Sequence, residues 1–110
     1  MAANKQKVRI TFKVNLEFEL DEKYTEIYLV GNANELGAWD ASNAIVLKRN
    51  GNVFRKTKVL PKDSNIEYKF LLSNAFSKVE VNKYFGDIEN RTLLLDDSKT
   101  VNHTVENFKL

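Results

Sequence analysis

The sequence predicts an all-β domain, and two observations lead to that prediction. Apolar and polar residues alternate in several short segments, which is the period-2 pattern of strands that bury one face and expose the other. Turn residues separate these segments, and no segment has the 3.6-residue period of an amphipathic helix. Seven to eight short strands of this kind are typical of an antiparallel β-sandwich, and we expect one of immunoglobulin-like type.

The composition is that of one globular domain. The chain has 110 residues, of which 43% are hydrophobic and 29% charged. A chain of this length and composition can form a single hydrophobic core without disulfides or structural metals. It has no cysteines, which excludes disulfides, thiol catalysis and cysteine-ligated metals. We expect residues 1–6 to form a disordered N-terminal tail and residues 7–110 to form the domain.

Charge and hydropathy narrow the choice of partners. The 17 basic and 15 acidic residues are mixed along the chain, without the basic tract of a nucleic-acid-binding protein. No apolar run approaches the ~18–20 residues that a membrane span needs. We therefore expect neither a nucleic-acid nor a membrane partner.

The first strand has the clearest pattern. The odd positions between residues 8 and 20 are polar or charged, and every even position is apolar: Val8, Ile10, Phe12, Val14, Leu16, Phe18 and Leu20. This pattern predicts a strand from Val8 to Leu20. Because strands usually have about 3–10 residues, we expect a bend or bulge partway. After a polar turn at residues 21–24, the short apolar run at residues 27–30 predicts a central strand.

The loop that follows contains the only tryptophan. The strand breaks at Gly31, the chain turns again at Gly37, and Trp39 lies in a polar stretch that runs to residue 43. Tryptophan is costly to leave in water because it has a large apolar surface and a single N–H donor. Trp39 is therefore either a plug of the core or a binding platform, and its own neighbours leave both alternatives open.

A hairpin is predicted in the middle of the chain. Strands at residues 44–47 and 53–60 flank a turn at residues 48–52, where Asn-Gly readily adopts the positive φ angles of a tight turn. The second strand contains three basic residues, Arg55, Lys56 and Lys58, which suits a solvent-facing or edge strand. Pro61 ends it because proline cannot donate a ladder hydrogen bond.

The segment at residues 66–72 alternates again. Tyr68 and Phe70 are expected to face the core, so Lys69 is presented on the opposite face. Beyond it we expect an irregular polar segment at residues 82–90, a weak strand at 77–81, and strands at 92–95 and 100–105.

No enzymatic constellation is evident. The single histidine, His103, falls inside a predicted strand, and one histidine without cysteines cannot build a typical metal site or nucleophile–base pair. Phosphate-binding loops and nucleophile elbows are absent from the sequence. Paired carboxylates can hydrolyse glycosides, but Glu35, Asp40, Asp87 and Glu89 are better explained as turn-forming or solvated acids in so small a domain. We expect no catalytic residue, metal or cofactor.

What remains is a set of aromatic, basic and amide side chains: Trp39, Lys69, Tyr84, Phe85 and Asn90. Such a mixture is suited to sugars, because flat rings pack against the C–H face of glucose while charged and amide groups hydrogen-bond the hydroxyls. The rings would be stacking platforms, and Lys69 and Asn90 would hold hydroxyls.

Several motifs appear in an order that resembles a starch-binding domain, a family 20 carbohydrate-binding module. They are Ile27-Tyr-Leu-Val-Gly31, Glu35-Leu-Gly-Ala-Trp-Asp40, Ala44-Ile-Val-Leu47, Leu60-Pro61, Glu67-Tyr-Lys-Phe70 and Glu89-Asn-Arg91. The resemblance covers roughly residues 7–108. It implies an immunoglobulin-like sandwich that binds α-1,4-glucans without cleaving them. It further implies attachment to a larger starch- or glycogen-active enzyme such as an amylase, glucanotransferase or glucan phosphatase or dikinase, with secretion slightly favoured.

The resemblance also assigns roles to residues. It implies that Trp39, Lys69 and Asn90 form the main sugar site. The family's second tryptophan, five residues before the Asn-Arg pair, falls on Phe85, and Tyr84 can serve instead. A second family site needs a tyrosine near Tyr24 and another in a longer loop.

Residues 48–52 are too short to supply that second tyrosine, so we expect the second site to be weak or missing. A protein–protein or domain-packing module with a degenerate sugar site is the alternative function, and a stand-alone glycosidase is a third hypothesis.

Overall fold

The computed structural model describes residues 6–109, so residues 1–5 of the predicted tail lie outside it. In this part of the chain there are three 3₁₀ helices, η1 (Asn34–Leu36), η2 (Ala41–Asn43) and η3 (Phe76–Lys78), and nine strands. The strands are β1 (Lys7–Leu16), β2 (Glu26–Gly31), β3 (Ile45–Asn50), β4 (Val53–Pro61), β5 (Asn65–Leu71), β6 (Glu80–Val81), β7 (Arg91–Leu94), β8 (Lys99–Val105) and β9 (Asn107–Phe108). None of the described helices is long and apolar enough to cross a membrane.

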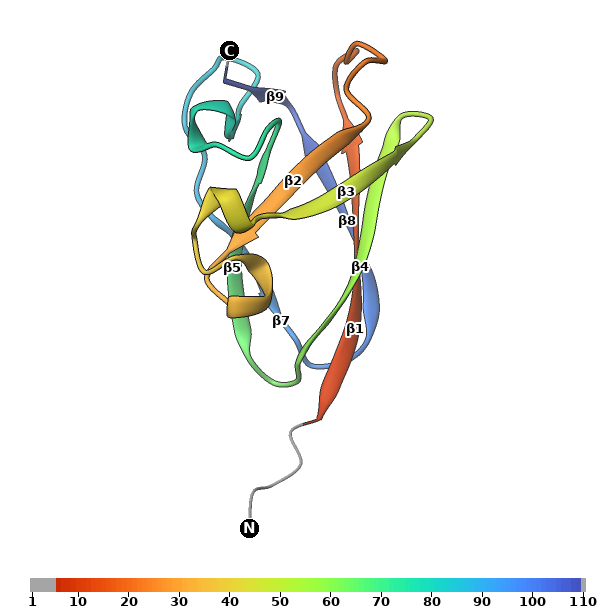
Figure 1. Cartoon of the computed structure of the whole chain (residues 1–110), viewed down its shortest axis with the longest axis vertical. Coiled ribbons are helices and arrows are strands. Elements are labelled where there is room, and N and C mark those ends of the chain that lie inside the picture. Colours follow the sequence, from red (N-terminus) through yellow and green to blue (C-terminus); the bar gives the residue numbers. More distant parts are fainter. Residues whose placement is uncertain (1–5, 110) are drawn as a thin grey trace.

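Seven strands form one curled sheet in the order β7-β5-β2-β3-β4-β1-β8, and β6 pairs with β9 in a separate ribbon. All pairs are antiparallel except β1 with β8, which run parallel. The curl brings β5 and β2 opposite β1 and β8, so the sheet encloses its own core as a β-sandwich (Figure 1). The predicted all-β sandwich is confirmed.

The alternation of β1 places its even residues in the core. Val8, Ile10, Phe12 and Val14 are all buried, as predicted. The strand itself ends at Leu16, not at Leu20, because the chain leaves β4 there and the next backbone N–H, of Glu17, donates to the carbonyl of Val105. Residues 16, 18 and 20 still pack against the core, so the apolar residues of this segment stay partly buried beyond the end of the strand.

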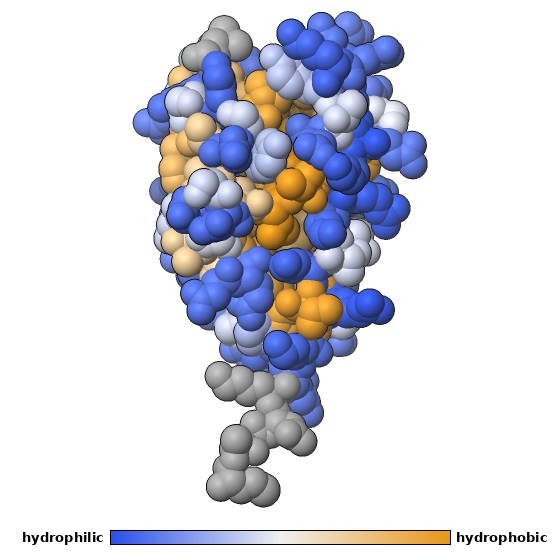
Figure 2. Space-filling view, viewed as in Figure 1, coloured by the Kyte–Doolittle hydropathy of each residue, from blue (hydrophilic) through white to orange (hydrophobic). Residues whose placement is uncertain are grey.

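The basic strand β4 lies inside the sheet order but has one open stretch. It pairs with β3 only over Val53–Arg55, whereas it pairs with β1 along its whole length. Hydrophobic residues are visible in the middle of the face shown in Figure 2, flanked by polar residues. Lys56 is exposed and Lys58 half-buried along this open stretch, where charged side chains discourage pairing with another strand. The sequence expectation of an edge strand therefore holds for only part of β4.

A buried polar pair lies at the centre of the core. The hydroxyl of Tyr68 and Nε2 of His103 are 2.7 Å apart, and Nδ1 of the same ring lies 3.1 Å from the carbonyl of Lys13. A carbonyl only accepts, so Nδ1 carries the proton and Nε2 accepts from the tyrosine. Burial lowers the pKa of His103 and raises the pKa of Tyr68 to about 12, which keeps both groups neutral. His103 thus has a structural place in β8.

The weak strand predicted at residues 77–81 is only partly correct. Its first residues form η3, and Glu80 and Val81 alone form β6. The short ribbon of β6 and β9 sits beside the end of β5, where Leu71 makes an isolated bridge to Val79. The irregular loop of residues 82–90 leaves the sheet at this point.

Candidate functional site

The Trp39 loop is built on the end of β2. The backbone N–H of Trp39 donates to the carbonyl of Gly31 at 2.8 Å, and the chain reaches this position through two residues with positive φ, Ala38 at 49° and Trp39 at 61°. Positive φ is uncommon for residues other than glycine and carries strain. Asp40 then caps η2 by accepting hydrogen bonds from the side chain and backbone N–H of Ser42, which lowers the pKa of Asp40.

The indole of Trp39 is half-buried on the outer face of the sheet. It packs against a small apolar cluster formed by Val30, Ala41 and Leu71, which is separate from the main core. Trp39 is therefore not a plug of the main core, and part of its side chain reaches solvent. The cluster supports one part of the side chain and the other part is accessible, and the role of binding platform stays a prediction.

Lys69 projects from β5 toward the outer face, as predicted, while Tyr68 and Phe70 are buried in the core. Lys69 is half-buried and faces Val30 on β2. Its Nζ donates to the carbonyl of Ile88, which ties β5 to the 82–90 loop.

Three neighbouring strands align the predicted site residues. Gly31 of β2 is opposite Tyr68 of β5, which is opposite Arg91 of β7. The backbone N–H of Trp39 is hydrogen-bonded to Gly31. Lys69 follows Tyr68 in the chain, and Asn90 precedes Arg91. Adjacent strands lie about 4.8 Å apart, so the anchors of the tryptophan and the asparagine are roughly 10 Å apart. The backbone positions that anchor or adjoin these three residues thus lie in one row across β2, β5 and β7.

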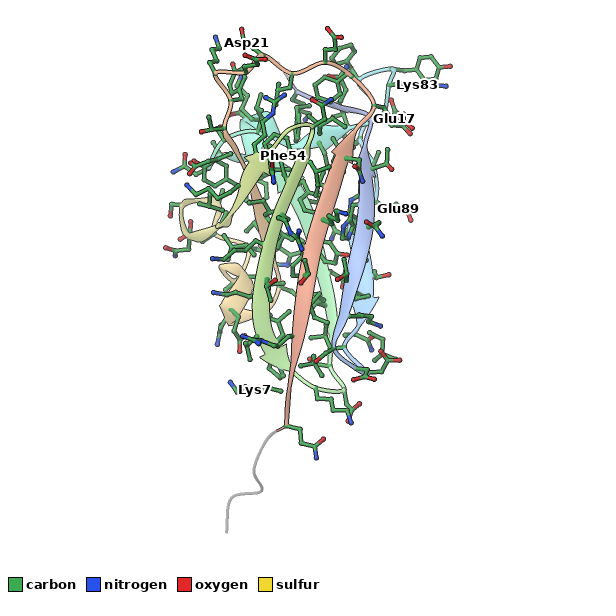
Figure 3. The ribbon with its side chains drawn as sticks, turned by 90° about the vertical axis from the view of Figure 1, so that its right-hand side faces the viewer. Lys7, Glu17, Asp21, Phe54, Lys83 and Glu89 are labelled. Carbon is green, nitrogen blue, oxygen red and sulfur yellow. The ribbon has the colours of Figure 1, made fainter. Side chains whose placement is uncertain are left out.

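The 82–90 loop carries two exposed aromatic rings. Tyr84 is 79% exposed and Phe85 is 51% exposed, with φ of 63°. The side-chain oxygen of Asn82 accepts from the backbone N–H groups of Tyr84 and Gly86, which fixes the tight turn at the tip. Figure 3 shows Lys83 and Glu89 of this loop projecting beyond β8, with Lys83 at the end of the molecule remote from Lys7.

Asn90 lies at the end of this loop and is exposed. Its amide donates to a carboxylate oxygen of Glu67 at 3.3 Å, and the Glu67 backbone in turn exchanges hydrogen bonds with Asn32. The amide of Asn90 is therefore held at the surface by a neighbour that is itself fixed to the Trp39 side of the sheet.

Sequence reasoning missed the ion pair between Glu80 and Arg91. Glu80 of β6 is 1% exposed and forms a bidentate ion pair with Arg91 of β7, with N–O distances of 2.7–3.2 Å. The Glu-Asn-Arg motif drew attention to Arg91, but nothing in the sequence distinguishes Glu80 from the exposed glutamates. Only the fold brings residues 80 and 91 together.

Tyr24, the candidate for a second site, is half-buried beside the start of β2. Arg49 holds its loop by donating to the carbonyls of Leu20, Asp21 and Tyr24 at 3.0–3.1 Å. A shallow groove of about 230 Å³ lies next to Tyr24, toward the end of β5, and Tyr28 and Ser73 also line it. Tyr24 is thus well separated along β2 from the Gly31 end that anchors Trp39.

The acidic residues considered for hydrolysis do not form a metal cluster. Within residues 6–109, no group of three or more histidine, cysteine, aspartate or glutamate side chains is arranged to hold a metal ion. Asp87 pairs with Lys109 at 3.5 Å, and Asp40 is engaged in the η2 cap. Asp40, Asp87 and Glu89 are exposed, and Glu35 is half-buried.

Comparison with known proteins identifies the family of the chain. A protein-family model described as a starch binding domain matches residues 7–105. No curated protein sequence matches the chain.

Solved structures of similar fold include two larger enzymes and one isolated carbohydrate-binding module. The family 15 glucoamylase of Hypocrea jecorina has a TM-score of 0.70 and 19% identity over 96% of this chain and 18% of its own. The γ-cyclodextrin glucanotransferase (gamma-CGTase) of alkalophilic Bacillus clarkii has a TM-score of 0.63 and 22% identity over 92% and 15%. The family 20 carbohydrate-binding module of the maltotetraose-forming amylase of Pseudomonas saccharophila has a TM-score of 0.62 and 16% identity over 88% and 99%.

At these identities the structural likeness shows the fold alone. The chain spans less than a fifth of the two larger enzymes but nearly the whole of the isolated module, so it corresponds to one domain of such proteins. The family model covers β1 to β8, including the Trp39 loop, Lys69 and Asn90. The chain belongs to the starch-binding domain family, the family 20 carbohydrate-binding modules.

Proposed function

We propose that this domain binds α-1,4-glucans, such as starch, glycogen or maltooligosaccharides, at the surface formed by Trp39, Lys69, Asn90 and the 82–90 loop. The observation that supports the proposal is the position of Trp39, which is half-buried on an apolar cluster and is hydrogen-bonded to Gly31, in register with the chain neighbours of Lys69 and Asn90. A ring fixed in this way offers a flat apolar surface without losing rotamer freedom on binding.

The binding chemistry follows from these side chains. The exposed part of the Trp39 indole would stack on the C–H face of one glucose, and Phe85 or Tyr84 would stack on a neighbouring glucose. The ammonium of Lys69 and the amide of Asn90 would bind hydroxyls, because both are strong hydrogen-bond donors. Two platforms at an angle would favour the bent shape of an α-1,4 chain. The set contains no nucleophile or acid–base pair, so we expect binding without hydrolysis.

The test is a titration with maltoheptaose or β-cyclodextrin, monitored by calorimetry in all variants and also by tryptophan fluorescence in those that keep Trp39. Trp39→Ala should weaken binding by about thirtyfold, corresponding to roughly 2 kcal/mol for a central stacking aromatic. Phe76→Ala is the matched control, since Phe76 is 44% exposed but lies outside the predicted site. Equal affinity of the two variants would refute the site.

The finer assignments follow the same logic. Loss of affinity in Phe85→Ala but not in Tyr84→Ala would identify Phe85 as the second platform, and the converse result would identify Tyr84. Tyr24 and its shallow groove are expected to bind weakly or not at all, which predicts one maltoheptaose per domain. We further propose that the domain works next to a starch- or glycogen-active catalytic domain, as the short coverage of the enzymes above supports.

One observation favours the alternative of a protein-contact or domain-packing module. Lys69 and Asn90 both donate hydrogen bonds inside the domain, to Ile88 and Glu67, and a sugar must compete with these partners. Absence of any α-glucan affinity in the wild-type domain would support this alternative.

A further inference from the structure

Glu80 is the only acidic residue that the described part of the protein buries, and the proposed sugar contacts do not use it. It lies in β6, immediately before the 82–90 loop. Its partner Arg91 is the first residue of β7, immediately after the loop. The ion pair therefore joins the two ends of the segment that carries Tyr84, Phe85 and Asn90.

The contacts of this pair extend to two further strands. Oε2 of Glu80 also accepts from the backbone N–H of Phe70 on β5 at 2.8 Å, and Nη2 of Arg91 also donates to the carbonyl of Thr104 on β8 at 2.8 Å. The guanidinium carbon lies 5.3 Å from the centre of the Phe70 ring. Bidentate arginine–carboxylate pairs are strong and directional, so the geometry of the loop ends is fixed.

The pair occupies a gap in the edge of the sheet. Along β5, the ladder with β7 ends where Tyr68 faces Arg91, and the isolated bridge to Val79 begins only at Leu71. Between these points the loop departs from the sheet, and the Glu80 carboxylate takes the N–H of Phe70. Lys69 lies in the same gap and reaches the loop at Ile88.

We propose that Glu80 is a positioning residue for glucan binding, which fixes the 82–90 loop through Arg91 so that its aromatic ring and Asn90 are preorganised beside Trp39 and Lys69. The inference rests on the proposed function, because it concerns how that surface is held. Preorganised groups bind more tightly since less conformational freedom is lost on binding. Without the carboxylate, Arg91 loses its charge partner in a half-buried position, and the loop opens locally.

The test compares Glu80→Gln with Glu19→Gln. Both variants make the same chemical change, but Glu19 lies outside the proposed surface, is exposed and makes no described ion pair. We expect Glu80→Gln to weaken maltoheptaose binding roughly tenfold, about 1.4 kcal/mol, and Glu19→Gln to change it by less than about twofold. Hydrogen exchange should rise in residues 82–90 of Glu80→Gln and stay unchanged in residues 7–16 of β1.

Each outcome decides the proposal. Faster exchange in residues 82–90 with unchanged affinity would make Glu80 purely structural and overturn its role in binding. If Glu80→Gln shows no cooperative unfolding transition, Arg91→Lys takes its place, because it keeps the charge but cannot form the bidentate pair. Arg91→Lys is then expected to weaken maltoheptaose binding and to speed exchange in residues 82–90 alone. Wild-type domain without glucan affinity would refute the proposed function together with this inference. Normal affinity in Glu80→Gln, with affinity lost in Trp39→Ala, would refute this inference alone.

Discussion

Gly31→Ala tests the link between the fold and the candidate site. A Cβ at Gly31 would lie 2.6 Å from the carbonyl oxygen of Glu67, 2.9 Å from Cδ1 of Leu36 and 3.1 Å from Cβ of Tyr68. The Glu67 carbonyl cannot move freely, because it accepts from the backbone N–H of Asn32 at 3.0 Å. Overpacking of this kind costs about 1–3 kcal/mol, and the backbone contact favours the upper half of that range.

Urea unfolding should therefore show a loss of about 2 kcal/mol in the free energy of unfolding, or roughly 10 °C in Tm for a domain of this size. Because the Gly31 carbonyl anchors the Trp39 N–H, the affinity for maltoheptaose should fall as well. Gly51→Asn is the control: φ is +66° there, nothing lies within 4 Å, and asparagine tolerates this conformation. An unchanged urea midpoint in Gly31→Ala would show that the strands can separate at no cost, and would refute the close-approach argument.

Three further changes test other parts of the structure. Burial lowers the pKa of His103 in the folded state, so the unfolded chain binds more protons below pH ~6.5. The free energy of unfolding should therefore be constant above pH ~6.5 and decrease as the pH falls through the folded pKa. Urea midpoints at several pH values should show this extra fall in the wild type and not in His103→Gln. Tyr68→Phe should lose about 1–3 kcal/mol in the same assay, since Nε2 of His103 is then left without its donor. Arg49→Ala should speed hydrogen exchange in residues 20–24 and leave the affinity for maltoheptaose unchanged. The contacts of Arg49 hold the loop that contains Tyr24 and do not involve the proposed sugar site.

Most of the fold was predictable from alternation and turn residues. The even residues of β1 are buried because period-2 patterning directly reports which face meets the core. Alternation does not report which strands pair, so it missed the end of β1 at Leu16 and the separation of β3 from β4. Those features depend on neighbours that are distant in the sequence, such as Val105 beside Glu17.

The candidate site was predictable to a similar depth. Lys69 was assigned to the outer face by strand parity, and its outward direction is confirmed. Glu80 could not have been found in this way, because a glutamate next to a valine in a short weak strand has the same local pattern whether it is exposed or buried. Its role depends on the return of the chain at Arg91, eleven residues later.

Trp39 shows why local sequence left two alternatives open. A loop tryptophan is usually explained either by burial or by ligand binding, but here Val30, Ala41 and Leu71 on the outer face support part of the side chain and leave the rest accessible. Both properties come from the same contacts, because an unsupported indole would lose more rotamer freedom on binding. Replacement of Trp39 therefore removes the packing together with the proposed platform. For this reason the loop variants at Tyr84, Phe85 and Glu80, which leave the Val30 cluster intact, separate sugar recognition from stability more cleanly than Trp39→Ala does.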